Sequence, residues 1–150
     1  MSDSIIAQNR KARHDYEFIA KFEAGIVLTG PEIKSVREHN VQLVGSYARI
    51  KNREVWLQDA HIAPYLNAGY SPHNAVRDRK LLLHKKEIWR INEMLGEKGL
   101  TLVPLSMYLV RGKAKVELGV GRGLKRYDKR QKLKERDQKM DMAQALRRNA

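Results

Sequence analysis

Residues Tyr16–Leu28 read YEFIAKFEAGIVL, and this stretch indicates the fold class. Every even position is apolar or aromatic, whereas the odd positions include Lys21 and Glu23. Successive side chains of a strand point to opposite faces, so an apolar period of two predicts a strand with one buried face. We expect one long strand here, bent at Gly25, because glycine inside a strand often marks a bend.

Two further pairs of strands follow the same pattern. In residues 103–109 and 114–120 every second side chain is apolar, and Arg111-Gly112-Lys113 provides a tight turn between the two runs. Residues 47–51 and 54–62 predict another pair of strands, joined by a turn at Asn52-Arg53. The segment from His61 to Ala75 contains two prolines, a glycine and two asparagines, and we expect a long loop there.

Helices are predicted to flank these strands. Gly30-Pro31 opens a short helix, since proline suits the first helical turn. Apolar residues recur at helical spacing from Leu81 to Leu95, and glycines follow at positions 96 and 99. Five or six antiparallel strands with two or three short helices predict a mainly β protein. The natural candidate is a closed, OB-like antiparallel barrel, which leaves few open sheet edges and commonly binds nucleic acid.

Charge divides the chain into two parts. The 150 residues include 30 Lys and Arg against 17 Asp and Glu, a formal net charge of +13, which favours an anionic partner such as nucleic acid. Residues 111–150 carry most of this excess, and three glycines lie between positions 119 and 123. We expect a globular body over residues 1–120 and a basic tail over residues 121–150. So dense a positive charge predicts a tail that is disordered when free and helical when phosphates neutralise it.

Several classes of protein are disfavoured by composition. Without cysteine, the chain has no disulfide, thiolate metal site or cysteine nucleophile, which fits a cytoplasmic protein. The five histidines form no metal-binding pair and the carboxylates are not grouped for two-metal catalysis, so we expect no enzyme, metal or cofactor. No apolar run is long enough for a membrane helix or a secretory signal, and the tail's apolar residues are too sparse to hold it on a membrane.

Six segments together resemble one known family. They run in the following order: Asn9–Tyr16 (NRKARHDY), Phe22–Ile26 (FEAGI), Glu32–Arg37 (EIKSVR), Arg79–Leu83 (RKLLL), Leu102–Leu105 (LVPL) and Tyr127–Arg130 (YDKR). In this order and spacing the chain resembles SmpB, the SsrA-binding protein family, from about Ile6 to Arg136. The resemblance implies a cytoplasmic, monomeric RNA-binding protein that delivers transfer-messenger RNA (tmRNA, or SsrA) to stalled ribosomes for trans-translation. The nascent chain is then tagged for degradation and the ribosome is released.

The resemblance also implies a surface that grips the tRNA-like domain of tmRNA. The matching positions are Asn9, Lys11, Glu23, Lys34 and Leu82. The lysines can contact phosphates, and Asn9 can reach base edges or ribose hydroxyls. Glu23 is open to two interpretations, a contact with a base amino group or an outward strand residue. Leu82 would be assigned to the core on its apolar character alone, and only the resemblance brings it to the surface.

The tail would, by the same resemblance, contact the ribosomal decoding centre and occupy the empty mRNA channel of the small subunit. Its candidate residues are Lys125, Tyr127, Asp128, Lys129 and Arg130. Tyr127 matches a position that is often histidine in relatives, and either ring can stack on a base. Leu124 departs from the family pattern, which commonly has a lysine there, so the role of position 124 is open.

Two alternative functions follow from the residues alone. A small ribosomal or other structured-RNA-binding protein with an OB barrel and a basic arm has the same composition, and only the sequence of motifs argues against it. A nuclease or RNA-modifying enzyme is disfavoured because no catalytic constellation is present. Selective binding to a tRNA-like RNA would distinguish the first alternative, and metal-dependent turnover of RNA would support the second.

Overall fold

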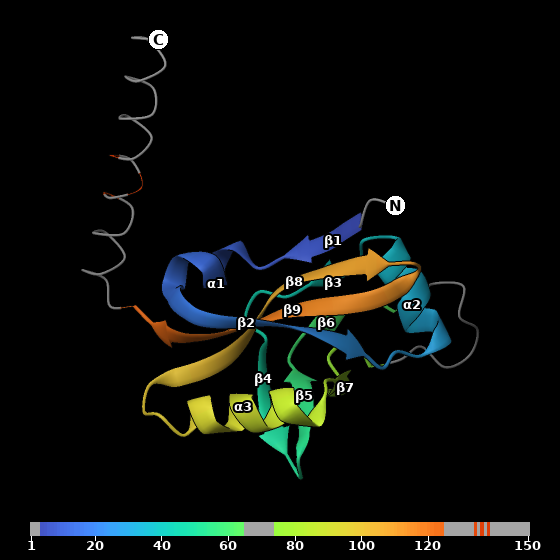
Figure 1. Cartoon of the computed structure of the whole chain (residues 1–150). Coiled ribbons are helices and arrows are strands. Elements are labelled where there is room, and N and C mark those ends of the chain that lie inside the picture. Colours follow the sequence, from blue (N-terminus) through green and yellow to red (C-terminus); the bar gives the residue numbers. More distant parts are fainter. Residues whose placement is uncertain (1–3, 65–73, 125–133, 135, 137, 139–150) are drawn as a thin grey trace.

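The computed structural model describes residues 4–64, 74–124, 134, 136 and 138. Three helices alternate with strands in the body of the chain (Figure 1). The helices are α1 (Arg10–Asp15), α2 (Gly30–Arg37) and α3 (Lys85–Leu95). The strands are β1 (Ser4–Gln8), β2 (Tyr16–Ile26), β3 (Val41–Gln42), β4 (Tyr47–Lys51), β5 (Glu54–Gln58), β6 (His61–Ile62), β7 (Arg79–Leu82), β8 (Leu100–Val110) and β9 (Lys113–Gly123). The prediction of a mainly β protein with a few helices is confirmed.

Seven strands form one antiparallel sheet in the order β1-β8-β4-β5-β7-β2-β9, and β8 pairs with β9 as well. Each of the six strands from β8 to β9 therefore pairs with two others of these six, and β8 pairs with β1 in addition. The contact between β4 and β8 is short, since Ala48 and Leu102 are its one pair of directly opposed residues. The ladders of β9 with β2 and with β8 are much longer and run along nearly the whole strand.

Both predicted hairpin turns are present. Asn52 and Arg53 have φ values of 52° and 62°, and Arg111 and Gly112 have φ values of 51° and 77°. Positive φ at both central residues is what a two-residue hairpin needs to match the twist of its strands. The turn at Asn52-Arg53 joins β4 to β5, and the turn at Arg111-Gly112 joins β8 to β9.

Two element boundaries differ from the prediction. The expected strand over residues 54–62 is divided into β5 and β6, because Asp59 has a φ of 62° that no continuous strand adopts. The helix expected from Leu81 begins only at Lys85, because Leu81 and Leu82 belong to β7 and Leu83 lies between the two elements. Leu81 is buried there and Leu82 is exposed, as alternation in a strand requires.

The even residues of β2 were expected on one face, and this is wrong at the start of the strand. The register shifts between Phe18 and Ala20, so Ile19 is an extra residue that reverses the facing of the strand. From Phe22 onward the even residues join the main core, whereas Tyr16 and Phe18 pack beneath α1 in a small second core. A matching shift in β8 between Pro104 and Ser106 turns Val103 and Leu105 to that second core.

Two glycines of β9 leave room for the side chains of this second core. A Cβ atom at Gly119 would lie 2.6 Å from Cδ1 of Phe18, and one at Gly121 would lie 2.6 Å from the same atom and 2.8 Å from the Glu17 carbonyl oxygen. The body was expected to end at residue 120. The strand instead continues to Gly123, which pairs with Tyr16 of β2.

We expect Gly121→Ala to lower the free energy of unfolding by about 1–3 kcal/mol, as overpacking of a filled site does. The added methyl group meets a carbonyl oxygen that belongs to the backbone and cannot turn away. Urea unfolding followed by circular dichroism measures the change. Gly123→Ala is the matched control, since its Cβ would meet nothing closer than 3.8 Å. Equal stability of the two variants would contradict the role given to Gly121.

Candidate nucleic-acid interface

Asn9 holds the start of α1 against the sheet. Its side-chain oxygen accepts a hydrogen bond from the Ala12 N–H at 3.1 Å, which caps the helix. Its Nδ2 donates to the carbonyl oxygens of Leu43 at 3.3 Å and Pro104 at 3.0 Å. The residue is only 2% exposed. The side-chain amide of Asn9, predicted as an RNA contact, is therefore engaged inside the protein, where it positions α1.

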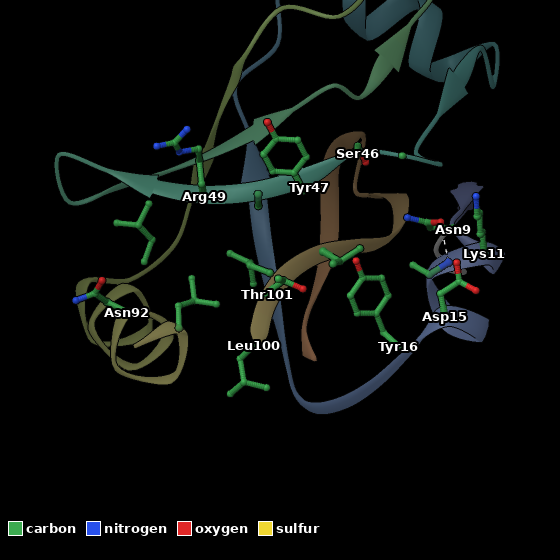
Figure 2. A pocket seen from close by; sticks show the side chains of 17 residues that line it. Asn9, Lys11, Asp15, Tyr16, Ser46, Tyr47, Arg49, Asn92, Leu100 and Thr101 are labelled. Carbon is green, nitrogen blue, oxygen red and sulfur yellow. Dashed lines mark hydrogen bonds between the residues drawn. The ribbon is translucent and has the colours of Figure 1, made fainter. Parts of the chain in front are cut away.

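Lys11 is exposed on α1 and borders a groove of about 720 Å³. The groove is lined by α1, β4, the start of β8 and the end of α3. In Figure 2 it extends from Asn92 on α3 to Lys11 on α1, with Arg49, Tyr47 and Tyr16 along it. Tyr47 is 42% exposed. Cations beside accessible aromatic rings can bind phosphates and stack bases. We call this groove the α1 groove, after the helix that borders it.

Glu23 and Leu82 meet in a second hollow of about 430 Å³. Gly25 lies opposite both Leu82 on β7 and Lys115 on β9, which brings the three strands together. Leu82 is 51% exposed, so the core assignment from its apolar character is wrong. The Tyr108 hydroxyl donates to Glu23 at 2.5 Å, which fixes the carboxylate at the surface. An oriented carboxylate beside a lysine and an apolar side chain can accept a hydrogen bond from a base amino group.

The five predicted residues do not form one cluster. α1 and α2 lie at opposite ends of β2 (Figure 1), and eleven residues of strand span about 33 Å. Lys11 is therefore at one end with the α1 groove, whereas Lys34 is exposed on α2, which follows the other end. Glu23 and Leu82 lie on strands that converge toward the α2 end. The structure thus presents two separate surfaces joined by β2.

A buried ionic network fixes α2 against β7. The Glu32 carboxylate accepts from Nε of Arg79 at 2.6 Å and from Nε of Arg77 at 3.0 Å, and Arg77 Nη2 makes a further contact with it. Arg79 also donates to the carbonyl oxygens of Ala60 at 2.9 Å and Ala75 at 3.1 Å. Glu32 and Arg79 are both fully buried. Since Lys34 is on α2 and Leu82 on β7, this network holds the elements that carry them.

The ionisation of Glu32 depends on these partners. Burial raises the pKa of this carboxyl group, but hydrogen bonds from Arg77, the Thr29 N–H and Arg79 outweigh it and lower the pKa to about 2. Burial lowers the pKa of Arg79, and its pairing with Glu32 opposes that effect. The Glu32 carboxylate therefore stays charged at any physiological pH. A Thr29 capping box places it at the first turn of α2.

Comparisons with known proteins find relatives that match nearly the whole chain. A family model described as SmpB protein matches residues 6–148. The chain belongs to the SmpB family. The SsrA-binding protein of Chloroflexus aggregans is 55% identical over 146 residues, which cover 97% of this chain and 92% of that protein. The SsrA-binding protein of Levilactobacillus brevis is 50% identical over 145 residues, with 97% and 92% coverage.

A solved structure also matches this member of the SmpB family. Its description reads "tmRNA-SmpB: a journey to the center of the bacterial ribosome". The TM-score is 0.67 at 47% sequence identity, and the match covers 83% of this chain and 91% of that one. At this identity the two chains share more than a general fold.

The structure reveals residues in and around the candidate site that the sequence did not indicate. Arg49 and Tyr47 belong to β4, whose alternation predicted only a strand. Arg79 was named only as the first residue of the RKLLL motif, and the structure shows it buried and paired with Glu32. Tyr108 was not singled out, although it orients Glu23.

The described residues hold neither a metal-binding cluster nor a membrane-spanning helix. Across residues 4–64 and 74–124, no group of three or more His, Cys, Asp or Glu side chains is placed to hold a metal ion. None of the described helices has the length and apolar character to cross a membrane.

The tail candidates Lys125, Tyr127, Asp128, Lys129 and Arg130 lie outside the described residues. Of the tail beyond Leu124, the described Lys134, Arg136 and Gln138 are helical and exposed.

We expect Glu32→Gln to lower the free energy of unfolding at pH 7 by about 3 kcal/mol, because buried Arg79 loses its charged partner. The folded pKa of Glu32 is depressed, so its contribution is complete above the ordinary carboxyl pKa and is lost as the pH falls through about 2. The variant should therefore lose less stability than the wild type between pH 5 and 2. Urea unfolding at a series of pH values measures both effects.

Glu38→Gln is the control for this prediction, since Glu38 is an exposed carboxylate at the other end of α2. Its substitution should change the stability by no more than about 0.5 kcal/mol. If the Glu32 and Glu38 variants unfold alike at every pH, the buried network does not hold α2 in place.

Proposed function

We propose that this protein binds the tRNA-like domain of tmRNA and delivers tmRNA to stalled ribosomes for trans-translation, tagging of the nascent chain and ribosome rescue. The observation that carries the proposal is membership of the SmpB family over nearly the whole chain, with relatives named SsrA-binding protein. The match to a solved tmRNA–SmpB structure supports the same partner and the ribosome. The protein acts by binding and positioning, in the cytoplasm, and we propose no catalytic step.

We also propose that the body is a closed, OB-like barrel. The cyclic pairing of β8, β4, β5, β7, β2 and β9 supports this, as do the long ladders on both sides of β9. A barrel leaves its loops and short helices to form the binding surface. The α1 groove and the hollow of Glu23 and Leu82 are then two contact sites for one large folded RNA.

The division of labour between body and tail is part of the proposal. The body binds RNA, and the tail occupies the empty mRNA channel, with Lys125, Tyr127, Asp128, Lys129 and Arg130 near the decoding centre. The concentration of positive charge beyond residue 120 supports it. Because β9 continues to Gly123 and the Leu124 N–H donates to the Asp15 carbonyl oxygen at 2.8 Å, we place the division after Leu124.

RNA binding is tested with the purified full chain and the isolated tRNA-like domain of tmRNA. We expect selective binding over a folded RNA of equal length, which a general structured-RNA-binding protein would not show. Affinity should fall steeply with salt, and Arg49→Ala and Lys11→Ala should each reduce the log–log salt slope by about one unit. Lys113→Ala is the control, since Lys113 is exposed but lines neither hollow.

Equal affinity for the tRNA-like domain and for the folded RNA of equal length would contradict the proposed function. If both groove variants kept the wild-type salt slope while Lys113→Ala reduced it, the RNA would contact the opposite end of β2. The assignment of the α1 groove would then be wrong.

A chain truncated after Leu124 should keep its affinity for the tRNA-like domain within about ten-fold and lose tagging on stalled ribosomes. It retains all of β9 and both hollows but none of the tail cations. Gel shift measures the affinity, and a reconstituted translation system with a message that lacks a stop codon measures tagging. Truncation after Val120 is the comparison, and it should also destabilise the body because Gly121 and Gly123 pair with β2. Normal tagging by the Leu124 truncation would show that the tail is dispensable.

A further inference from the structure

Trp89 projects from α3 into solvent. Its side chain is 66% exposed, although α3 buries Ile91 completely and packs Ile88, Met94 and Leu95 against the main core. Tryptophan carries the largest apolar surface of any side chain, and leaving it in water on an otherwise amphipathic helix is unfavourable unless something covers it. Neither the α1 groove nor the hollow of Glu23 and Leu82 includes it.

Two hollows border Trp89. One, of about 560 Å³, is lined by residues of β4, the β4–β5 turn and α3, and the other, of about 450 Å³, lies on α3 itself. Trp89 and Lys85 are the two residues common to both. The ring therefore stands between two open spaces, which leaves room for a flat group to lie against it.

Positive charge surrounds this ring. Arg53, Lys85, Lys86 and Arg90 line the two hollows, and no carboxylate lines either of them. Arg90 borders the hollow on α3, and its guanidinium lies 5.8 Å from the centre of the Phe22 ring of β2. Of the two acidic residues on α3, Glu87 accepts from the His84 N–H at 3.2 Å and so turns to the start of the helix, and Glu93 is exposed one turn after Trp89 but lines neither hollow.

The chemistry of this surface selects one class of partner. An exposed indole with four surrounding cations matches the way proteins hold unpaired nucleotides, in which a base stacks on the ring and the phosphates meet Lys and Arg. An acidic protein surface would neutralise the cations without using the ring. A lipid surface would need a broader apolar face than one tryptophan provides.

The surface is also continuous with the α1 groove. Ile50 and Asn92 line both that groove and the hollow beside Trp89. Arg49 and Ile50 are neighbours on β4, and Arg53 follows in the turn to β5, so cations continue from one space into the other. A strand of RNA that occupies the α1 groove can therefore extend over β4 and reach Trp89.

We infer that Trp89 is a stacking platform for an unpaired nucleotide of tmRNA, with Arg53, Lys85, Lys86 and Arg90 around its phosphates. This inference rests on the proposed function, because it assigns an additional contact to the same RNA. It extends the RNA-binding surface from α1 across β4 to α3.

Tryptophan fluorescence tests the contact directly. The chain has two tryptophans, and Trp56→Phe leaves Trp89 as the sole reporter while keeping a ring at position 56. Titration of this variant with full-length tmRNA should quench its emission, because a stacked base quenches an indole. Circular dichroism confirms that the variant is folded.

Affinity is the second readout. Trp89→Ala should bind full-length tmRNA at least about five-fold more weakly, as loss of one stacked base does. Trp89→Phe should recover part of that loss. Ile19→Ala, which shortens another exposed apolar side chain at the β2 bulge, should bind as the wild type does.

The outcomes separate this inference from the proposed function. Saturating tmRNA that leaves Trp89 emission unchanged, with wild-type affinity in Trp89→Ala, overturns the inference alone and points to a protein partner at Trp89. If the wild-type chain does not bind tmRNA, the proposed function fails and the inference fails with it. Quenching together with weaker binding of Trp89→Ala supports both.

Discussion

The double pairing of β9 is the constraint on which the rest of the structure depends. This strand is bonded to β2 on one side and to β8 on the other along nearly its whole length. Both partners carry an extra residue, near Ile19 and near Leu105, while β9 itself stays regular. The two bulges turn part of each partner strand to the outer face of the sheet, and α1 covers that part. Gly119 and Gly121 make the arrangement possible because they leave room for Phe18.

This arrangement determines where the proposed RNA-binding groove lies. α1 is held over the second core by Ala12 and by the buried amide of Asn9, so Lys11 has a fixed position at the rim of the groove. The end of β9 lies beside α1, where the Leu124 N–H bonds to the Asp15 carbonyl oxygen. The basic tail therefore starts next to the α1 groove. One strand ladder thus orders both the groove and the origin of the segment with the highest charge density.

The sequence predicted the strands that follow one simple period and missed those that do not. The alternation in Tyr16–Leu28 and the hairpin turn at Arg111-Gly112 both identified real elements. β7 was missed because it has only four residues, and three leucines ahead of an amphipathic helix resemble its first turn. The bulges were missed because an extra residue keeps the apolar period intact while it reverses the face. Only the packing of Phe18 against glycine reveals that reversal.

The candidate site was harder to predict than the fold, since its parts come from distant positions and a side chain's chemistry does not reveal its burial. Asn9 and Arg79 carry groups that bind nucleic acid well, yet both donate hydrogen bonds to acceptors inside the protein. The acceptors are carbonyl oxygens for both residues and, for Arg79, also the Glu32 carboxylate. Leu82 and Trp89 are apolar, yet both are exposed. In each case the partner lies on another element, such as Glu32 on α2 for Arg79. A buried charge requires a specific partner, whereas a surface charge requires none. The polar side chains that remain available for RNA are therefore those not used in buried hydrogen bonds or ion pairs. Only the folded structure shows which side chains these are.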